Sequence, residues 1–375
     1  MIATVLSRVG IGVAANTPIG LDVAPRAVRA AQLQRTGGRW SVRALGHWDR
    51  REDEQGDRAP DGYARRIRRA MDQADFRGFR AAAGLSAPDI EFHMLEVPER
   101  GGLEDPQKFA EAVRWELNRV TSVPEGRALS DFWRVPTSSA ARTSAIGVVA
   151  HGASVDSASH LIESIGLDCE RVDTTACALV RLGSMVRNRP GVDAGGIWAV
   201  LDVGERMSRL VIAVDDRPVL VRGIGSGGHG WSEAIAKALG VSFDAAEIHK
   251  CDHGIAIHGE GASEAPSVAD NVAELIFNSL RTDLDAAAGE IERSYEYVLR
   301  CYPDRNPGEL LLVGGGCTMK GLAKHLAERL GIVVDRLSGI VAGADPVLSV
   351  APHQRGSIDA FACAMGLSLD PEMAS

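Results

Sequence analysis

Paired cysteines are absent from this chain of 375 residues. Its six cysteines occur singly, none forms a CxxC pair, and most stand in apolar stretches. Isolated cysteines in a chain of this size are typical of reduced, buried thiols. The cysteine pattern therefore predicts a cytosolic protein.

Long apolar runs are also absent. No run reaches the roughly 18 residues that a transmembrane helix needs. The mildly apolar start, residues 1–15, is interrupted by Arg8 and follows no basic segment, so it does not resemble a signal peptide. We expect a cytoplasmic protein with no transmembrane segment of its own, one that reaches a membrane only through a partner.

An excess of positive charge is the third absence. Lys and Arg number 41 against 50 Asp and Glu, which gives a net charge of -9. Nucleic-acid binding needs a basic face to neutralise phosphates, so no nucleic-acid partner is expected. One basic cluster stands out, formed by Arg65, Arg66, Arg68 and Arg69. A solvated helix face is the favoured interpretation, and contact with anionic lipid headgroups is the alternative.

The chain does contain three apolar segments that run into tight turns. They are Leu201-Asp202-Val203-Gly204, the stretch from Leu311 to Gly314-Gly315-Gly316, and a third that holds Asp22 before Ala24-Pro25. An Asp at a strand end can hold hydrated Mg²⁺ beside nucleotide phosphates. Glycines let backbone amides approach such a ligand closely. Each signal is weak alone.

The hydrophobic pattern predicts an α/β protein whose length favours two domains or one elaborated domain. Two strand-turn-strand cores, residues 19–48 and 199–224, suggest a duplicated fold. Between them a β-α-β-β-α unit is expected, with its helices at residues 105–120 and 154–165. Further helices are expected at residues 231–239, 243–250, 268–299, 320–330 and 357–369.

The order of these motifs resembles the actin-like ATPase superfamily, whose phosphate 1, phosphate 2 and adenosine motifs line one cleft. Within it the chain resembles the PilM family of type IV pilus assembly, related to FtsA and to the cytoplasmic part of the type II secretion L protein. Residues 197–214, 225–250 and 311–332 look like the second domain, and residues 82–173 like the inserted subdomain 1C. The implied division is residues 1–88 and 169–195 for subdomain 1A, 89–168 for 1C, 196–344 for domain 2, and 345–375 for a closing helix.

The resemblance implies ATP or ADP with Mg²⁺ in the cleft. Asp202, Gly204 and Ser208 match phosphate 2, although an ordinary hairpin with a surface Asp would look the same. Gly314, Gly315 and Gly316 match the adenosine motif, against a simple tight turn. Glu247 and Lys250 match the Glu-x-x-Lys of a helix that reaches the nucleoside, against a surface ion pair. Mg²⁺ would be held through water by Asp22 and Asp202.

Two departures from the family pattern predict weak chemistry. In phosphate 1, Ala24-Pro25-Arg26 replaces the glycine turn and Arg29 stands where a Lys is usual, so the loop cannot cradle a phosphate in the ordinary way. In the crossing helix after the insert, Thr175 stands where a Glu is common, and threonine is no general base at neutral pH. Asp22 and Asp173 are the remaining candidate catalytic carboxylates.

A cluster of His249, Cys251, His253 and His258 has residue types that bind zinc, but its spacing matches no standard finger, so zinc is not favoured. The resemblance implies a scaffold that docks the cytoplasmic N-terminal tail of an inner-membrane pilus assembly protein between 1A and 1C, with slow or no ATP hydrolysis. Self-association and filament formation remain open. The alternatives are a type II secretion L-like adaptor, which normally continues into a transmembrane helix, and a sugar-kinase-like phosphotransferase.

Overall fold

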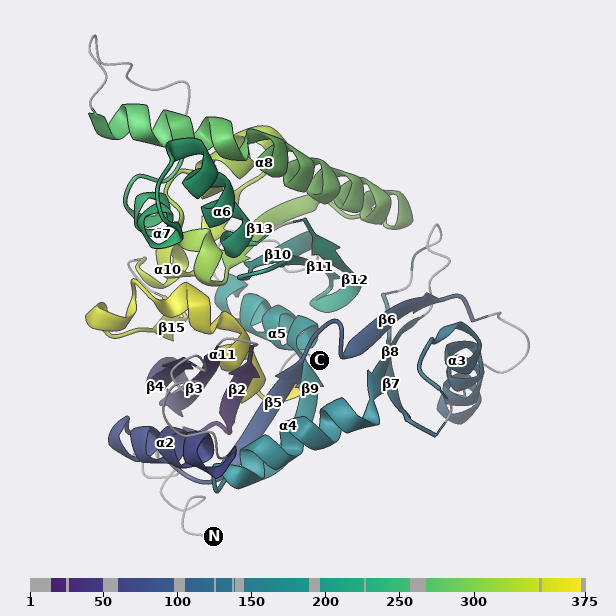
Figure 1. The fold of residues 1–375 in the computed structure, drawn as a ribbon. Coiled ribbons are helices and arrows are strands. Elements are labelled where there is room, and N and C mark those ends of the chain that lie inside the picture. The colour runs from purple at the N-terminus through teal and green to yellow at the C-terminus, as the bar shows by residue number, and fades with distance from the viewer. Residues whose placement is uncertain are drawn as a thin grey trace.

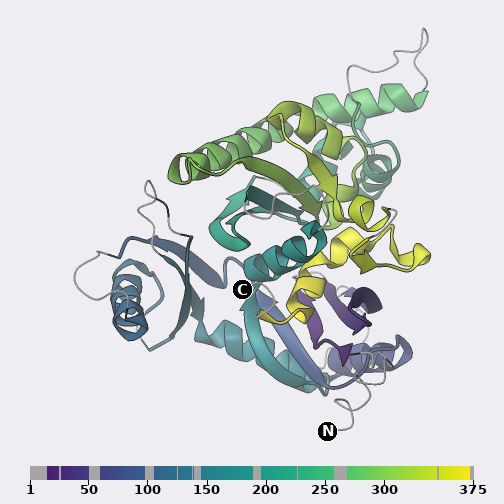
Figure 2. The same ribbon diagram turned by 180° about the vertical axis from the view of Figure 1, so that it is seen from behind.

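Two large sheets and one small sheet organise the chain (Figure 1). The computed structural model describes residues 15–24, 27–49, 60–97, 105–124, 126–136, 138, 145–188, 196–225, 227–256, 268–343 and 346–371. Helices α5 (Thr175–Arg187) and α11 (Ala362–Ser368) lie between the two large sheets, and the small sheet stands to one side, as the view from behind also shows (Figure 2).

The first large sheet has the strand order β15-β4-β3-β2-β5-β9, and β1 pairs with β3. Apolar residues on one of its faces pack against α2 (Pro60–Gln73) and α4 (Gly152–Ser164), and those on the other pack against α5 and α11. The strands are β1 (Ala15–Asn16), β2 (Ile19–Val23), β3 (Ala27–Thr36), β4 (Arg39–Asp49), β5 (Arg80–Leu85), β9 (Asp168–Thr174) and β15 (Leu348–Ser349).

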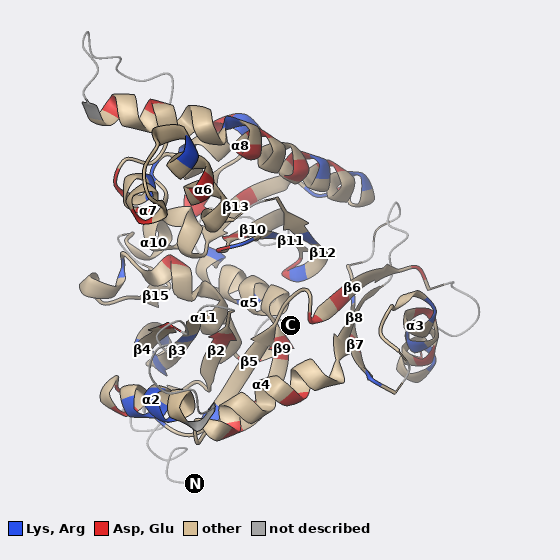
Figure 3. Cartoon of the chain, viewed as in Figure 1, with Lys and Arg blue, Asp and Glu red and all other residues tan. Residues whose placement is uncertain are grey.

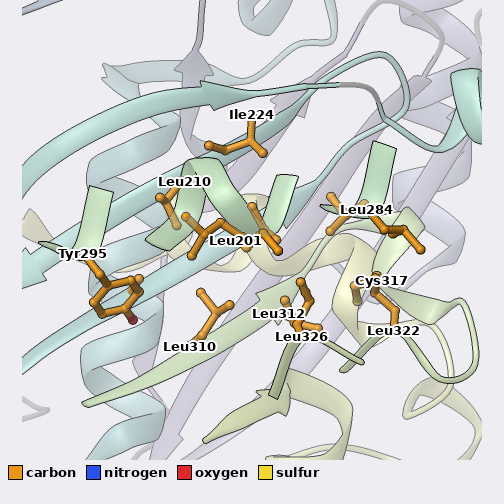
Figure 4. Packing of buried hydrophobic residues seen from close by; sticks show 14 of the residues in the cluster. Leu201, Leu210, Ile224, Leu284, Tyr295, Leu310, Leu312, Cys317, Leu322 and Leu326 are labelled. Carbon is orange, nitrogen blue, oxygen red and sulfur yellow. The ribbon is translucent and has the colours of Figure 1, made fainter. Parts of the chain in front are cut away.

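The second large sheet has the order β12-β11-β10-β13-β14. Side chains alternate across it, so Leu201 faces one core and Val200 the other, and the strand is apolar throughout because both faces are covered. Figure 4 shows Leu201, Leu210 and Leu310 packed with residues of the covering helices. The strands are β10 (Ile197–Val203), β11 (Ser208–Val214), β12 (Arg217–Ile224), β13 (Pro307–Val313) and β14 (Val334–Arg336); the helices are α6 (Gly228–Leu239), α7 (Phe243–Asp252), α8 (Val268–Cys301), α9 (Leu322–Leu330) and α10 (Leu337–Val341).

The two large sheets repeat one arrangement. In each, three consecutive strands form an antiparallel meander, β2-β3-β4 in the first sheet and β10-β11-β12 in the second. Two later strands extend the sheet in parallel beside the first meander strand, β5 and then β9 next to β2, and β13 and then β14 next to β10. Thus β2 corresponds to β10 and β3 to β11. This equivalence supports the duplication that the sequence suggests, and it places Asp22 and Asp202 at matching positions.

The small sheet, in the order β6-β8-β7, forms the insert. Its own core lies between the sheet and α3, where Phe109, Val113 and Leu117 are buried. The sequence placed the next helix, α4, in the same unit. The structure differs, because Ala158 and Ile162 of α4 pack mainly in the core of the first large sheet. The elements are β6 (Ile90–Leu95), α3 (Pro106–Val120), β7 (Ala128–Arg134) and β8 (Ala145–His151).

Two other expectations need correction. The segment from Val172 to Ala178 was expected in the crossing helix, but Asp173 lies in strand β9 and α5 begins only at Thr175. The closing helix is divided into a 3-10 turn, η4 (Ile358–Phe361), and α11. After residue 345 the chain returns to the first sheet, where β15 pairs with β4. In the part of the chain that the structure describes, no helix is long and apolar enough to cross a membrane.

Candidate functional site

Two matching Asp-Arg pairs lie where the large sheets approach each other. Asp22 on β2 stands directly opposite Arg29 on β3, and Asp202 on β10 directly opposite Arg209 on β11. Their closest oxygen-to-nitrogen distances are 3.8 Å and 3.4 Å. Between 19% and 25% of each of the four side chains is exposed, so the cluster is recessed without being sealed.

Electrostatics show that the two pairs are neighbours. Burial raises the pKa of Asp22, the charge of Arg29 opposes that shift, and the carboxylate of Asp202 adds to it. Burial also raises the pKa of Asp202, against the charges of Arg209 and Arg29. Each carboxylate therefore interacts with the arginine of the other domain as well as its own.

The glycine turn after β13 packs against the Asp202 strand end. Gly314 has a φ of +86°, and a Cβ there would lie 2.4 Å from Asp202 Oδ1. A Cβ on Gly316 would lie 2.5 Å from Val203 Cγ1. These two glycines are thus required by contacts within the protein. Gly315 is exposed, and a Cβ there would meet nothing within 4 Å. Of the three glycines in this turn, Gly315 is therefore the one that leaves open space for a ligand.

Behind this turn lies a buried carboxylate that the sequence analysis missed. Asp359 is fully buried and accepts hydrogen bonds from Arg336 Nη2 at 2.6 Å and Ser338 N at 2.7 Å, and its carbonyl accepts one from Gly314 N at 2.8 Å. It fixes the turn to the C-terminal segment. Its apolar neighbours Ile358 and Phe361 were the available signal, since an Asp there must be paired.

Lys250 on α7 is buried, which excludes the surface ion pair considered for it. Its Nζ donates to Gly228 O at 2.8 Å, to Ser232 Oγ at 2.7 Å and to Glu247 Oε2 at 2.9 Å. Burial raises the pKa of Glu247, but hydrogen bonds from Lys250 and Ser232 outweigh this, and the net pKa is lowered. Glu247 is 46% exposed, so of the two residues it is the one open to a ligand.

The Asp202 turn rests on the first turn of α6. Gly228 N donates to Gly204 O at 3.0 Å, His229 N to Glu205 O at 2.7 Å, and Gly227 N to Arg206 O at 3.0 Å. Backbone amides at a helix N-terminus are the usual phosphate donors. Here these three are already bonded to turn carbonyls.

Ser208, expected beside the phosphates, is buried in the first position of β11, opposite Val203. In the phosphate 1 segment, Ala24 N donates to Ala27 O at 3.0 Å. Pro25 and Arg26, which replace the family's glycine turn, lie outside the described residues.

Asp173 is held by arginines. Its carboxylate pairs with Arg181 of α5, lies 3.6 Å from Arg171 Nε and accepts a hydrogen bond from Thr174 N at 2.6 Å. Thr175 is buried at the start of α5, against Gly84 of β5. These contacts anchor Asp173 to neighbouring elements and give no support to a role for it in orienting water.

No group of three potential metal ligands occurs among the described residues. His249 and His253 stack with ring centroids 5.5 Å apart, and His258 lies outside the described part of the chain. Asp22 and Asp202, the carboxylates assigned to Mg²⁺, each face a guanidinium that would repel a cation. The site does not fit a magnesium ion, and magnesium binding there remains an unsupported prediction.

The paired sheets, with α5 and α11 between them and an insert after β5, define an actin-like fold. The family model for type IV pilus assembly protein PilM matches residues 20–370, and the chain belongs to this family. A solved structure of the PilM-PilN type IV pilus biogenesis complex has a chain that is 22% identical, with a TM-score of 0.70, covering 96% of this chain and 99% of that one.

Two other similar structures are more distant. The ethanolamine utilization protein EutJ from Carboxydothermus hydrogenoformans is 14% identical, with a TM-score of 0.44, covering 95% of this chain and 89% of EutJ. MreB5 of Spiroplasma citri bound to ADP is 12% identical, with a TM-score of 0.41, covering 93% of this chain and 94% of MreB5.

Proposed function

We propose that this protein is a scaffold at the cytoplasmic face of a type IV pilus machine, where it docks the cytoplasmic N-terminal tail of a PilN-like inner-membrane protein. The observation that carries this proposal is the agreement along the whole chain with the protein solved as part of a PilM-PilN complex. Family membership across residues 20–370 supports it. Membrane attachment is then supplied by the partner.

The strand edges beside the insert support docking of an extended peptide. Among the described strands, β9 is the last of the first large sheet and β6 is an outer strand of the insert sheet (Figure 1). An edge strand presents backbone donors and acceptors on one side, and a peptide can add to it as a further strand. We place the docking site between these two edges. Backbone pairing and apolar pockets, not charge, should supply the affinity.

Nucleotide binding between the two domains is the second part of this proposal. We infer that the cleft holds ATP or ADP weakly, with Gly315 leaving room for the nucleoside and Glu247 reaching it. Asp202, Gly204, Ser208, Lys250, Gly314 and Gly316 shape the surrounding walls. Hydrolysis should be slow or absent, because Thr175 replaces the family carboxylate and Asp173 is paired with Arg181. No observation favours a phosphotransferase or a filament-forming role.

Removal of the insert tests the docking proposal. Asp89 and the end of β8 are adjacent, since His151 N donates to Asp89 O at 3.2 Å and Ser154 Oγ to Asp89 Oδ1 at 2.8 Å. Residues 90–151 can therefore be replaced by a short Gly-Ser linker while α4 keeps its place in the first core. A fluorescent peptide from the N-terminus of the organism's PilN-like protein should bind the full chain and lose at least about tenfold in affinity for the shortened one.

The shortened chain must first show a cooperative thermal transition by circular dichroism, because Trp133 Nε1 of the insert donates to Pro218 O of domain 2 at 2.7 Å. A charge-reduced full chain, Arg65→Gln with Arg69→Gln on exposed positions of α2, serves as the matched control. Figure 3 shows the basic residues of α2 in blue. Equal peptide binding with and without the insert would refute the proposed docking site. Membrane recruitment that is lost only in the α2 variant would instead indicate lipid contact by the arginines.

A further inference from the structure

We propose that Arg29 and Arg209 together form an anion site that binds nucleotide phosphates without a divalent metal ion. This inference rests on the proposed binding of a nucleotide in the cleft, and it specifies the charge state of the ligand. It predicts a free nucleoside polyphosphate where the actin-like pattern would suggest a magnesium complex.

The strand register brings the two arginines into equivalent places. Each lies directly opposite the Asp of the adjacent meander strand. Because β2 and β10 correspond, each domain contributes one guanidinium at the place where the two large sheets approach each other. Each also acts electrostatically on the carboxylate across the cleft. A group lying between the domains would therefore meet both.

The charged groups of this cluster suit an anion better than a cation. Asp22, Asp202, Arg29 and Arg209 carry two negative and two positive charges, so the cluster is formally neutral before any ligand enters. A Mg²⁺ ion needs carboxylates that are free to bind its water shell, and here it would approach two guanidiniums. Arginine keeps its charge at any ordinary pH and presents a planar fork of N–H donors that suits phosphate oxygens.

The guanidinium groups of Arg29 and Arg209 have N–H donors that their aspartates do not fully use. Hydrogen bonds between charged groups are usually about 2.7 to 2.9 Å long. The separations of 3.8 Å for Arg29 and Asp22 and 3.4 Å for Arg209 and Asp202 exceed that range. Each arginine is thus neutralised by its Asp without being tightly bonded to it, and it can turn its fork to an incoming anion.

Backbone amides around the Asp202 turn are already hydrogen-bonded within the protein. The amides of Gly227, Gly228 and His229 are bonded to the Asp202 turn, and that of Gly314 is bonded to Asp359 O. These amides are the donors that a phosphate would otherwise use. Side chains must replace them, and the two arginines are the cations recessed at the point where the two sheets meet.

Calorimetry on the full chain tests the proposal, with ADP, ATP and inorganic pyrophosphate titrated in EDTA and, separately, in excess Mg²⁺. Wild type should bind at least as tightly in EDTA as in Mg²⁺. Arg29→Gln and Arg209→Gln should each weaken binding in EDTA by about tenfold or more, the usual effect of losing a charged hydrogen bond. Arg29→Lys should keep part of the affinity. Arg305→Gln is the matched control, since Arg305 also pairs with an Asp, Asp215, at 2.7 Å but lies at the far end of the sheet.

The outcomes distinguish failure of the metal-free arginine site from failure of nucleotide binding as a whole. Binding that strengthens tenfold on addition of Mg²⁺, or that survives both glutamine variants in folded protein, would overturn the metal-free arginine site and leave nucleotide binding intact. No binding of ADP or ATP under either condition would overturn nucleotide binding as a whole, while the peptide assay would still report on docking. Thermal unfolding of every variant shows whether a lost affinity reflects a lost fold.

Discussion

At the scale of single residues, the buried Lys250 shows how a motif residue can serve the fold. Its side chain is 5% exposed, and its ammonium group has three acceptors from α6 and α7. A buried charge of this kind is tolerable only while its hydrogen bonds are complete. Lys250 therefore joins α6 to α7 beside the Asp202 turn.

We predict that Lys250→Met lowers the free energy of unfolding by about 2 kcal/mol, because Ser232 and Gly228 O lose their donor, while Glu247 can turn to water. Urea denaturation at neutral pH measures this. Lys237→Met on the exposed side of α6 should stay within about 0.5 kcal/mol of wild type. Unchanged stability combined with lost ADP binding would show that Lys250 acts on the ligand instead.

At the scale of elements, one carboxylate joins α3 to the insert sheet. Glu91 on β6 accepts hydrogen bonds from Ser122 Oγ, from Ser122 N at 3.1 Å and from Thr121 Oγ1 at 2.9 Å, just beyond the end of α3. The Ser122 hydroxyl contributes most, and the hydrogen bonds with His93, Ser122 N and Thr121 add to it, so the pKa of Glu91 is lowered to about 2 against the opposing effect of burial.

This lowered pKa predicts a pH dependence. The stabilisation is present above the ordinary value of 4.5 and is lost as the pH falls from 4.5 toward 2, since the unfolded chain takes up the proton first. Wild type should exceed Glu91→Gln by on the order of 1 kcal/mol at pH 6, after allowance for solvent screening. The difference should shrink toward zero near pH 2.5, as measured by urea denaturation. Glu111→Gln, on the exposed side of α3, should show no such convergence.

The elements that the sequence predicted well are those with strong apolar patterns. Strands such as Ile197–Val203 are apolar on both faces and were placed within about two residues. Strand β9 was missed because its sequence, Asp-Cys-Glu-Arg-Val-Asp-Thr, is mostly polar, as suits an edge strand. The packing of helix α4 on the first large sheet could not be foreseen, because an amphipathic pattern shows that a helix has a buried face without showing what covers it.

In the candidate site, too, some features could be predicted from local sequence and others could not. The glycine turns and both Asp residues could be found from their spacing. The opposition of Asp202 and Arg209 could not, because it depends on the register of the hairpin between β10 and β11. That register decides whether the carboxylate faces a metal ion or a guanidinium. Local sequence gives the residues of such a site more readily than their partners.

At the scale of the whole molecule, α5 and α11 together unite the two domains. Helix α11 packs on β2, β3, β5 and α5, while α5 also packs on β10, β11 and β12, and both helices belong to the core shared by the two large sheets. The approach is close, since a Cβ on Gly366 would lie 2.0 Å from Ala178 O of α5, and one on Gly20 would lie 1.9 Å from Ala364 O. Backbone atoms at these distances cannot be displaced without moving a helix.

Gly366→Ala should therefore destabilise the entire chain by about 3 kcal/mol or more, through overpacking between α5 and α11. Differential scanning calorimetry should show a lower transition temperature for both domains together. Gly339→Ala in α10 is the control, because a Cβ there meets nothing within 4 Å and alanine favours a helix. A variant whose first domain alone melts early would show that α11 does not couple the domains.

The long helix α8 has a mechanical consequence. Its 34 residues form one rod about 50 Å long. Near one end, Ala273 O accepts a hydrogen bond from Ala256 N, just after the helix that carries Lys250. Near the other end, Ser138 Oγ of the insert donates to Cys301 O at 2.6 Å. Between these two contacts, Ile276, Leu284 and Ile291 are buried in the core of the second large sheet. The helix thus works as a strut, because one continuous element fastens both the segment after α7 and the insert to that sheet.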